Sequence, residues 1–125
     1  MRLLLDTHIL LWWLDDDPRL TATLRQAILD GSNEILVSSI TVAEIEIKKA
    51  HGKLDVPREL LTLLDEAGFR TLPLSAAHAQ RLRELPPHHA DPFDRMLVAQ
   101  AIVEGVPLAT ADVRLSAYEV ELFAS

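Results

Sequence analysis

The segment His-Ala-Asp-Pro-Phe-Asp-Arg-Met-Leu-Val-Ala-Gln-Ala, residues 89–101, tells most about the fold of this chain. It predicts a helix that begins near Pro92, because proline is favoured at the first helical position. One face of that helix carries the side chains at positions i, i+3, i+4, i+7 and i+8, namely Asp94, Leu97, Val98, Ala101 and Ile102. Four of them are apolar, and the fifth is a carboxylate, which is costly to bury alone. The sequence therefore predicts a partner for Asp94.

Two aspartates lie at the start of this predicted helix. Asp91 directly precedes Pro92 and occupies the position of an N-cap, whose side chain accepts hydrogen bonds from the first backbone N–H groups. Asp94 suits the positive end of the helix dipole. Because Asp91 lies before the apolar face and Asp94 lies within it, we expect Asp91 to be the cap and Asp94 to have another role.

Composition limits the class of protein. The chain has 125 residues, which favours a single domain over residues 1–125. It has no cysteine, which excludes a disulfide framework and a thiolate metal site and fits the reducing cytoplasm. Since no apolar run is long enough to span a bilayer, we expect a cytoplasmic protein without a membrane segment.

The net charge of −7 argues against a broad surface for nucleic acid, because phosphate contacts need lysine and arginine. An acidic total is also what a highly soluble protein shows. A third explanation is that some of the acids gather at a metal site. Composition alone leaves these explanations open.

Short apolar runs alternate with amphipathic segments along the chain. Strands are expected at residues 3–5, 34–38, 69–74, 106–110 and 120–123. Helices are expected at residues 8–14, 18–30, 39–51, 56–67, 75–85 and 92–104, with Pro18 and Val56-Pro57 opening the second and the fourth, and a helical turn follows at 112–117. This alternation predicts an α/β protein with a mainly parallel sheet of four to five strands and helices on both faces.

Four acidic residues follow or approach the carboxyl ends of these strands, where ligands bind in open parallel sheets. Asp6 comes directly after the first strand, and Asp112 comes just after the fourth. Glu44 lies in the first turns of the helix after the second strand, and Asp94 lies in the first turn of its own helix. All four are expected to reach one edge of the sheet.

Each acid also has an explanation as a helix cap, worth about 1 kcal/mol. Thr41 with Glu44, for example, fits a capping box. Caps do not explain why the acids gather at one edge, where like charges repel unless a cation neutralises them. Hard oxygen ligands suit Mg²⁺ or Mn²⁺. Spacing does not decide between Glu44 and Glu46, which flank the apolar face of their helix about equally.

Four motifs, taken in order, resemble those of PIN-domain ribonucleases, in particular the VapC-type toxins of bacterial toxin–antitoxin pairs. They are Leu-Leu-Leu-Asp-Thr-His at 3–8, Val-Ser-Ser-Ile-Thr-Val-Ala-Glu-Ile-Glu-Ile-Lys-Lys at 37–49, the segment 89–101, and Leu-Ala-Thr-Ala-Asp at 108–112. The resemblance covers essentially the whole chain. The block that begins Asp-Pro-Phe-Asp-Arg is specific, and the ordered set of four motifs is strong.

The resemblance implies a three-layer α/β/α sandwich and an endoribonuclease that depends on Mg²⁺ or Mn²⁺. It also implies a homodimer and a cognate antitoxin whose C-terminal segment covers the active site. The family's acidic quartet maps onto Asp6, Glu44, Asp94 and Asp112, and Glu44 is preferred to Glu46 on this ground alone. Asp6 and Asp94 are expected to bind metal directly, Glu44 to bind a second metal or orient water, and Asp112 to act through water.

Other residues near these motifs have weaker expectations. Thr110 matches a hydroxyl position near the last acid, and Thr7 and Arg95 adjoin the site in sequence. A Glu44–Lys48 pair at i, i+4 is an alternative to an RNA-binding role for the lysines of that helix. The loop residues His88 and His89 are expected to be solvent-exposed bystanders rather than a general acid pair. Trp12 and Trp13 are expected in the core or at a dimer contact.

Two other functions share part of this pattern. A phosphoacceptor receiver domain has a similar length and Mg²⁺-binding acids, but it needs paired acids after the first strand, an acceptor aspartate after the third and a late lysine. The chain offers Asp6 alone, Pro73-Leu74-Ser75 and no such lysine. A catalytically silent PIN-like binding module is the other alternative, and nothing in the sequence favours it.

Overall fold

Five parallel strands form one sheet in the order β3-β2-β1-β4-β5 in this computed structural model, which describes residues 1–56 and 58–124. The strands are β1 (Arg2–Leu5), β2 (Glu34–Ser38), β3 (Arg70–Leu72), β4 (Leu108–Thr110) and β5 (Leu122–Ala124). The register pairs Leu5 of β1 with Val37 of β2 on one side and with Ala109 of β4 on the other. The carboxyl ends of the three central strands therefore meet at one edge.

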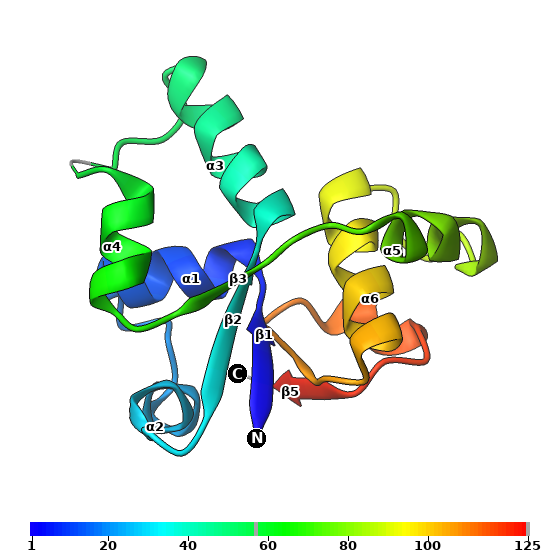
Figure 1. Ribbon diagram of the computed structural model, residues 1–125, viewed down its shortest axis with the longest axis horizontal. Coiled ribbons are helices and arrows are strands. Elements are labelled where there is room, and N and C mark those ends of the chain that lie inside the picture. The colour runs from blue at the N-terminus through cyan, green and yellow to red at the C-terminus, as the bar shows by residue number, and fades with distance from the viewer. Residues whose placement is uncertain (57, 125) are drawn as a thin grey trace.

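Helices cover both faces of the sheet. They are α1 (Thr7–Leu14), α2 (Ala22–Leu29), α3 (Ser39–Ala50), α4 (Leu60–Glu66), α5 (Ala76–Arg81) and α6 (Pro92–Glu104), with 3₁₀ turns η1 (Leu82–Glu84) and η2 (Val113–Ala117). Figure 1 shows α1, α2 and α4 on one side of the strands and α5 and α6 on the other. The expected α/β/α sandwich is confirmed, and all five strands are parallel. None of the helices described here has the length and apolar character that a bilayer crossing needs.

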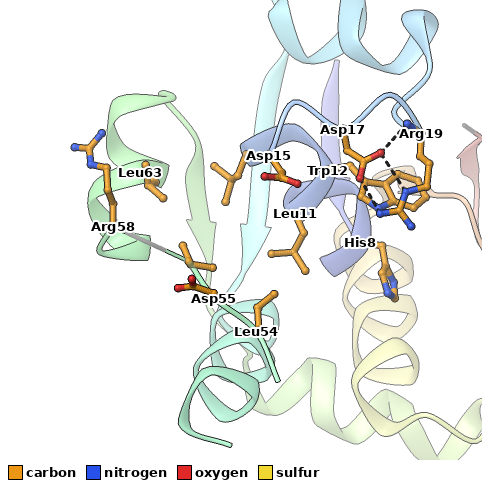
Figure 2. Close-up of a pocket in the computed structure, with 12 residues that line it drawn as sticks. His8, Leu11, Trp12, Asp15, Asp17, Arg19, Leu54, Asp55, Arg58 and Leu63 are labelled. Atoms are coloured by element: carbon orange, nitrogen blue, oxygen red, sulfur yellow. Dashed lines mark hydrogen bonds and ion pairs between the residues drawn. The ribbon is translucent and has the colours of Figure 1, made fainter. Parts of the chain in front are cut away.

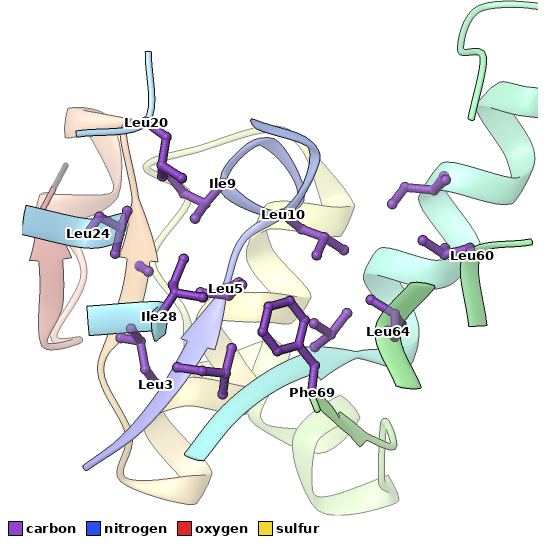
Figure 3. Packing of buried hydrophobic residues seen from close by; sticks show 14 residues of the cluster. Leu3, Leu5, Ile9, Leu10, Leu20, Leu24, Ile28, Leu60, Leu64 and Phe69 are labelled. Atoms are coloured by element: carbon purple, nitrogen blue, oxygen red, sulfur yellow. The ribbon is translucent and has the colours of Figure 1, made fainter. Parts of the chain in front are cut away.

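Alternate residues of the central strands enter two separate cores, as the two-residue period of a strand requires. Leu3 and Leu5 of β1 pack with α1, α2 and α4, where Figure 3 shows them among Ile9, Leu24 and Phe69. Leu4, which lies between them, packs instead with Leu97 and Val98 of α6. The all-apolar sequence of β1 is thus explained by burial on both faces.

The strand order decides against a receiver domain. Receiver domains follow the order 2-1-3-4-5, in which the third strand neighbours the first. Here β1 lies between β2 and β4, and β3 lies at the edge beyond β2. The topology therefore agrees with the sequence, which lacks the acceptor aspartate that a receiver needs after its third strand.

Several predicted boundaries were wrong, each for a local reason. The second helix begins at Ala22 rather than Pro18, because the Thr21 side chain accepts the backbone N–H of Leu24 and caps it there. The fourth helix begins at Leu60, and Pro57, which was expected to open it, lies outside the described residues. Strands β3 and β4 are shorter than expected, at three residues each.

Helix α6 follows the sequence prediction closely. The side chain of Asp91 accepts hydrogen bonds from the backbone N–H groups of Phe93 at 2.8 Å and Asp94 at 3.4 Å, which confirms it as the N-cap. Gly105 ends the helix with φ of 67°, a left-handed conformation that glycine adopts without strain. Leu97, Val98 and Ala101 are buried as expected. Asp94 is thereby fixed on the face of α6 that turns toward the sheet.

Candidate metal centre

The four acids predicted from the sequence are carried by four different elements. Asp6 joins β1 to α1, Glu44 lies in α3, Asp94 lies in the first turn of α6, and Asp112 follows β4 and precedes η2. Their charges act on one another: Asp94 raises the pKa of Asp6, while Glu44 and Asp112 contribute to the raised pKa of Asp94. The fold therefore brings the acids together around Asp94, at the carboxyl edge of the central strands.

Asp6 and Glu44 are the two most buried acids of the group, and each residue is 5% exposed. It is the N-cap of α1 and accepts the backbone N–H of Ile9 at 2.8 Å. Burial raises the pKa of Asp6 to about 6, against the lowering effect of hydrogen bonds from the Thr110 side chain and from Ile9. Asp6 thus serves as a cap and is also a carboxylate whose ionisation is opposed by its surroundings.

Glu44 is held by two side chains. Its Oε1 accepts a hydrogen bond from the Thr7 hydroxyl at 2.8 Å, and its Oε2 lies 2.7 Å from the Lys48 ammonium. The expected pair at i, i+4 with Lys48 is therefore present. Glu46 is exposed and lies 3.6 Å from Lys49, whereas Glu44 is buried, so the two glutamates differ in their exposure to solvent. The capping-box explanation of Glu44 was wrong, because Ser38 caps α3.

Asp94 and Asp112 are linked by a histidine. The Nε2 of His89 lies 3.0 Å from Oδ2 of Asp94 and 3.3 Å from Oδ2 of Asp112. The His89 side chain is only 8% exposed, so the expectation of a solvent-exposed bystander was wrong for this residue. Burial, followed by the charge of Asp91, raises the pKa of Asp94, although His89 lowers it. His88, its neighbour, is exposed and packs edge-on against Tyr118.

Asp112 is also bound by an arginine. Arg114 donates from Nε to Oδ1 at 3.0 Å and from Nη2 to Oδ2 at 2.8 Å. The side-chain hydrogen bond from Arg114 lowers the pKa of Asp112 to about 2. Asp112 additionally caps η2 by accepting the backbone N–H of Arg114. Its own backbone N–H donates to the Thr110 hydroxyl at 3.0 Å, and Thr110 thus connects Asp112 to Asp6.

Arg95, which adjoins Asp94 in sequence, turns away from the acids. Its guanidinium donates to the backbone carbonyls of Pro86 at 3.1 Å and of Leu82 and Leu85 at 3.4 Å each. It also donates to the hydroxyl of Tyr118 at 3.2 Å. Arg95 therefore ties the loop after η1 to α6, and its predicted contact with RNA stays a prediction.

A hollow of about 290 Å³ opens beside the acids and is lined by Asp6, His8, Trp12, Arg19, Ala111 and Asp112. A larger cavity of about 460 Å³ shares His8, Trp12 and Arg19 with it and extends between α1 and the segment 54–63. In Figure 2, Arg19 lies beside Asp17 and over Trp12, its guanidinium carbon 5.0 Å from the ring centre. Trp12 is half-buried at this boundary, where it also packs against the core as expected.

The donor set fits a hard divalent cation. Among the described residues, ligand atoms of His89, Asp94 and Asp112 all lie within 4.8 Å of one another, and Asp6 and Glu44 lie outside that group. Carboxylate oxygens are the ligands preferred by Mg²⁺, and imidazole nitrogen is accepted by softer cations. A buried carboxylate such as Asp6, whose ionised form is disfavoured, is the kind of group that a cation would stabilise.

His89 and Arg114 are the two groups at this centre that sequence reasoning missed. His89 faces Asp112, which is distant from it in sequence, and Arg114 is an exposed residue of the short turn η2. The hydrophobic pattern therefore indicates neither contact. The one signal for His89 is its position two residues before the cap Asp91, whose backbone N–H donates to His89 Nδ1 at 3.3 Å. Such a local contact fixes the ring next to the first turn of α6.

The chain resembles known proteins in both sequence and fold. Residues 3–121 match the family described as PIN domain. The chain is 30% identical over 118 residues to Ribonuclease VapC22 of Mycobacterium tuberculosis, and the match covers 92% of this chain and 90% of that protein.

Solved structures agree with the fold. VapBC2 from Rickettsia felis, bound to a DNA fragment from its promoter, matches with a TM-score of 0.72 and 20% identity over 98% of this chain and 96% of that chain. FitAcB from Neisseria gonorrhoeae matches with a TM-score of 0.67 and 25% identity over 97% of this chain and 96% of that chain.

Proposed function

The chain belongs to the PIN domain family, and we propose that it is a metal-dependent endoribonuclease, the toxin of a toxin–antitoxin pair that a cognate antitoxin neutralises. The observation that carries this proposal is the convergence of Asp6, Glu44 and Asp112 on Asp94 at the carboxyl edge of the sheet. These carboxylates come from separate parts of the chain and meet at one place, which independent helix caps would not explain and a shared metal site would.

Mg²⁺ or Mn²⁺ is the cation we propose, with Asp6 and Asp94 as direct ligands and Asp112 beside them. A divalent cation in such a site polarises a phosphoryl oxygen and makes water a better nucleophile. Asp6 approaches from β1 and Asp94 from α6, so the two carboxylates reach the ion from different sides of the edge. The Thr110 hydroxyl orients Asp6, and Arg114 fixes both oxygens of Asp112.

Glu44 has a different environment, and we assign it a different part in the reaction. Its carboxylate is oriented by the Thr7 hydroxyl and neutralised by the Lys48 ammonium. A carboxylate that is fixed by these two partners can orient the attacking water. A second cation, if one bound here, would share Glu44 with Lys48, whose ammonium contacts Oε2.

The substrate reaches the acids through the hollow beside Asp6 and Asp112. Arg19 lies at this opening with its guanidinium paired to Asp17, and it lies over the half-buried ring of Trp12. We further propose a cytoplasmic homodimer whose residues 1–125 act as one domain, with its antitoxin covering the acids.

The test is cleavage of a labelled RNA by the purified protein with Mg²⁺, with Mn²⁺ and with EDTA. Cleavage that EDTA abolishes and Mg²⁺ restores supports the proposal. Asp6→Asn should remove the activity, and Asp65→Asn, which changes an exposed aspartate of α4, is the matched control that should retain it. If wild-type protein binds RNA without cleaving it under any of these conditions, the chain is a silent binding module and the proposal is refuted.

A further inference from the structure

His89 is a buried side chain that the proposed reaction does not yet use. Its Nε2 faces Asp94 and Asp112 at 3.0 and 3.3 Å, but neither contact is aligned as a full hydrogen bond. A polar nitrogen that is buried and not fully paired normally costs stability. Its retention between two carboxylates therefore points to a role at the metal centre.

The proton of the neutral ring can be placed from the other nitrogen. Nδ1 accepts the backbone N–H of Asp91 at 3.3 Å, so the proton of the neutral ring lies on Nε2, which faces the two carboxylates. A histidine that binds metal usually donates its second N–H to an acceptor, whereas here Nδ1 faces a donor. The arrangement is that of a hydrogen-bond donor to the ligands rather than of a ligand.

The backbone of His89 is held in place independently of its ring. Its N–H donates to the hydroxyl of buried Tyr118 at 3.0 Å, and its carbonyl accepts from Arg95 at 3.5 Å. Arg95 in turn donates to Tyr118 at 3.2 Å and to the Pro86 carbonyl at 3.1 Å. Because Arg95 is adjacent to Asp94 in α6, the same helix fixes both the acid and the loop that carries its partner.

We propose that His89 is a positioning residue that holds Asp94 of α6 and Asp112 of the β4 exit at the spacing in which they bind the cation. Two carboxylates this close repel, and without a donor between them they would separate. His89 Nε2 approaches Oδ2 of Asp94, and the other oxygen of Asp94 is left available to the ion. Hydrogen-bond donors to ligating carboxylates typically contribute roughly 10- to 100-fold to metal affinity.

This inference rests on the proposed metal site, and its experiment measures metal binding rather than cleavage. Mg²⁺ and Mn²⁺ dissociation constants are measured by calorimetry for wild-type protein, His89→Ala, His89→Gln and His88→Ala. His89→Ala should weaken both cations by roughly 10- to 100-fold. His89→Gln, whose side-chain amide also donates, should recover part of the loss. His88→Ala, at the exposed neighbouring ring, should bind like wild-type, and far-UV circular dichroism checks that each variant is folded.

The outcomes separate this inference from the proposed function. Wild-type protein that binds neither cation overturns both. Wild-type binding with unchanged or tighter binding in His89→Ala overturns only the positioning role. A loss in His89→Ala that is much larger for Mn²⁺ than for Mg²⁺ shows a direct nitrogen ligand instead, because imidazole suits Mn²⁺ better. Long-range ¹⁵N–¹H spectra of the wild-type ring give a second readout, and a proton on Nδ1 would contradict the proposed donor.

Discussion

Replacing Asp6 by asparagine should stabilise the protein while it abolishes cleavage. Burial raises the pKa of Asp6 from its ordinary 3.8 to about 6, so the folded state opposes the charge that the proposed metal site needs. A difference of about 2 pH units corresponds to about 3 kcal/mol at neutral pH. Asparagine keeps the cap on Ile9, since it is as good an N-cap as aspartate. The raised pKa already includes the favourable contact of the charge with the Ile9 N–H, so the expected gain is about 3 kcal/mol.

The pH dependence follows from the direction of the shift. Between pH 3.8 and about 6 the unfolded state of the wild-type protein has released the Asp6 proton while the folded state retains it. Wild-type stability is therefore lost as the pH rises through this window, and the loss is complete above it. Asp6→Asn has no such proton. The stability difference between the two proteins should be small near pH 4 and should reach its full value near pH 7.5.

The assays are urea denaturation and thermal denaturation, each followed by circular dichroism at pH 4–8. EDTA is present so that no cation offsets the charge of Asp6. For a domain of this length the gain corresponds to a rise in melting temperature on the order of 10 °C at pH 7.5. Added Mg²⁺ should then raise the melting temperature of wild-type protein but not of Asp6→Asn. A variant that is less stable than wild-type at pH 7.5, or a difference that does not depend on pH, would refute the reasoning.

Three further substitutions follow from the same contacts. Asp94→Asn should abolish cleavage with little change in helix content, because Asp91 still caps α6. Asp91→Ala should cost about 1 kcal/mol in urea denaturation and should retain cleavage; a complete loss of cleavage in folded protein would contradict the division between the two aspartates. Arg114→Ala should raise the pKa of Asp112 from about 2 toward its ordinary range, as followed by NMR titration of its carboxyl carbon. An unchanged titration would show that Arg114 does not hold this carboxylate in solution.

Helix α6 shows which parts of the fold can be read from sequence. Its start, its cap and its end are each set by residues within the helix or next to it, namely Asp91, Pro92 and Gly105. The start of α2 was mispredicted because two acceptable signals, Pro18 and Thr21, lie three residues apart and only Thr21 has a side-chain oxygen that accepts a helical N–H. Strand lengths depend on pairing with neighbours, which no local pattern encodes, and β3 and β4 were accordingly predicted too long.

In the candidate site, too, local sequence predicts some residues and misses others. Asp6, Glu44 and Asp112 were predicted because the end of a strand or the start of a helix places each of them, and local sequence predicts both features. The choice of Glu44 over Glu46 came from resemblance, and the structure adds the physical reason that Glu44 is buried. His89 was missed because its contacts include the hydroxyl of Tyr118, which is 29 residues away in sequence.

The surroundings of the acids explain how a fold keeps them together. Glu44 has the Lys48 ammonium, Asp112 has the Arg114 guanidinium, and His89 lies between Asp112 and Asp94. For Asp6 the contacts are hydrogen bonds from neutral groups, which are weaker than those of a cation, and its pKa rises to about 6. The unfavourable free energy of ionising the cluster is therefore concentrated on Asp6. A cation that binds there relieves the largest unfavourable term, so metal binding should stabilise the protein most strongly through this residue.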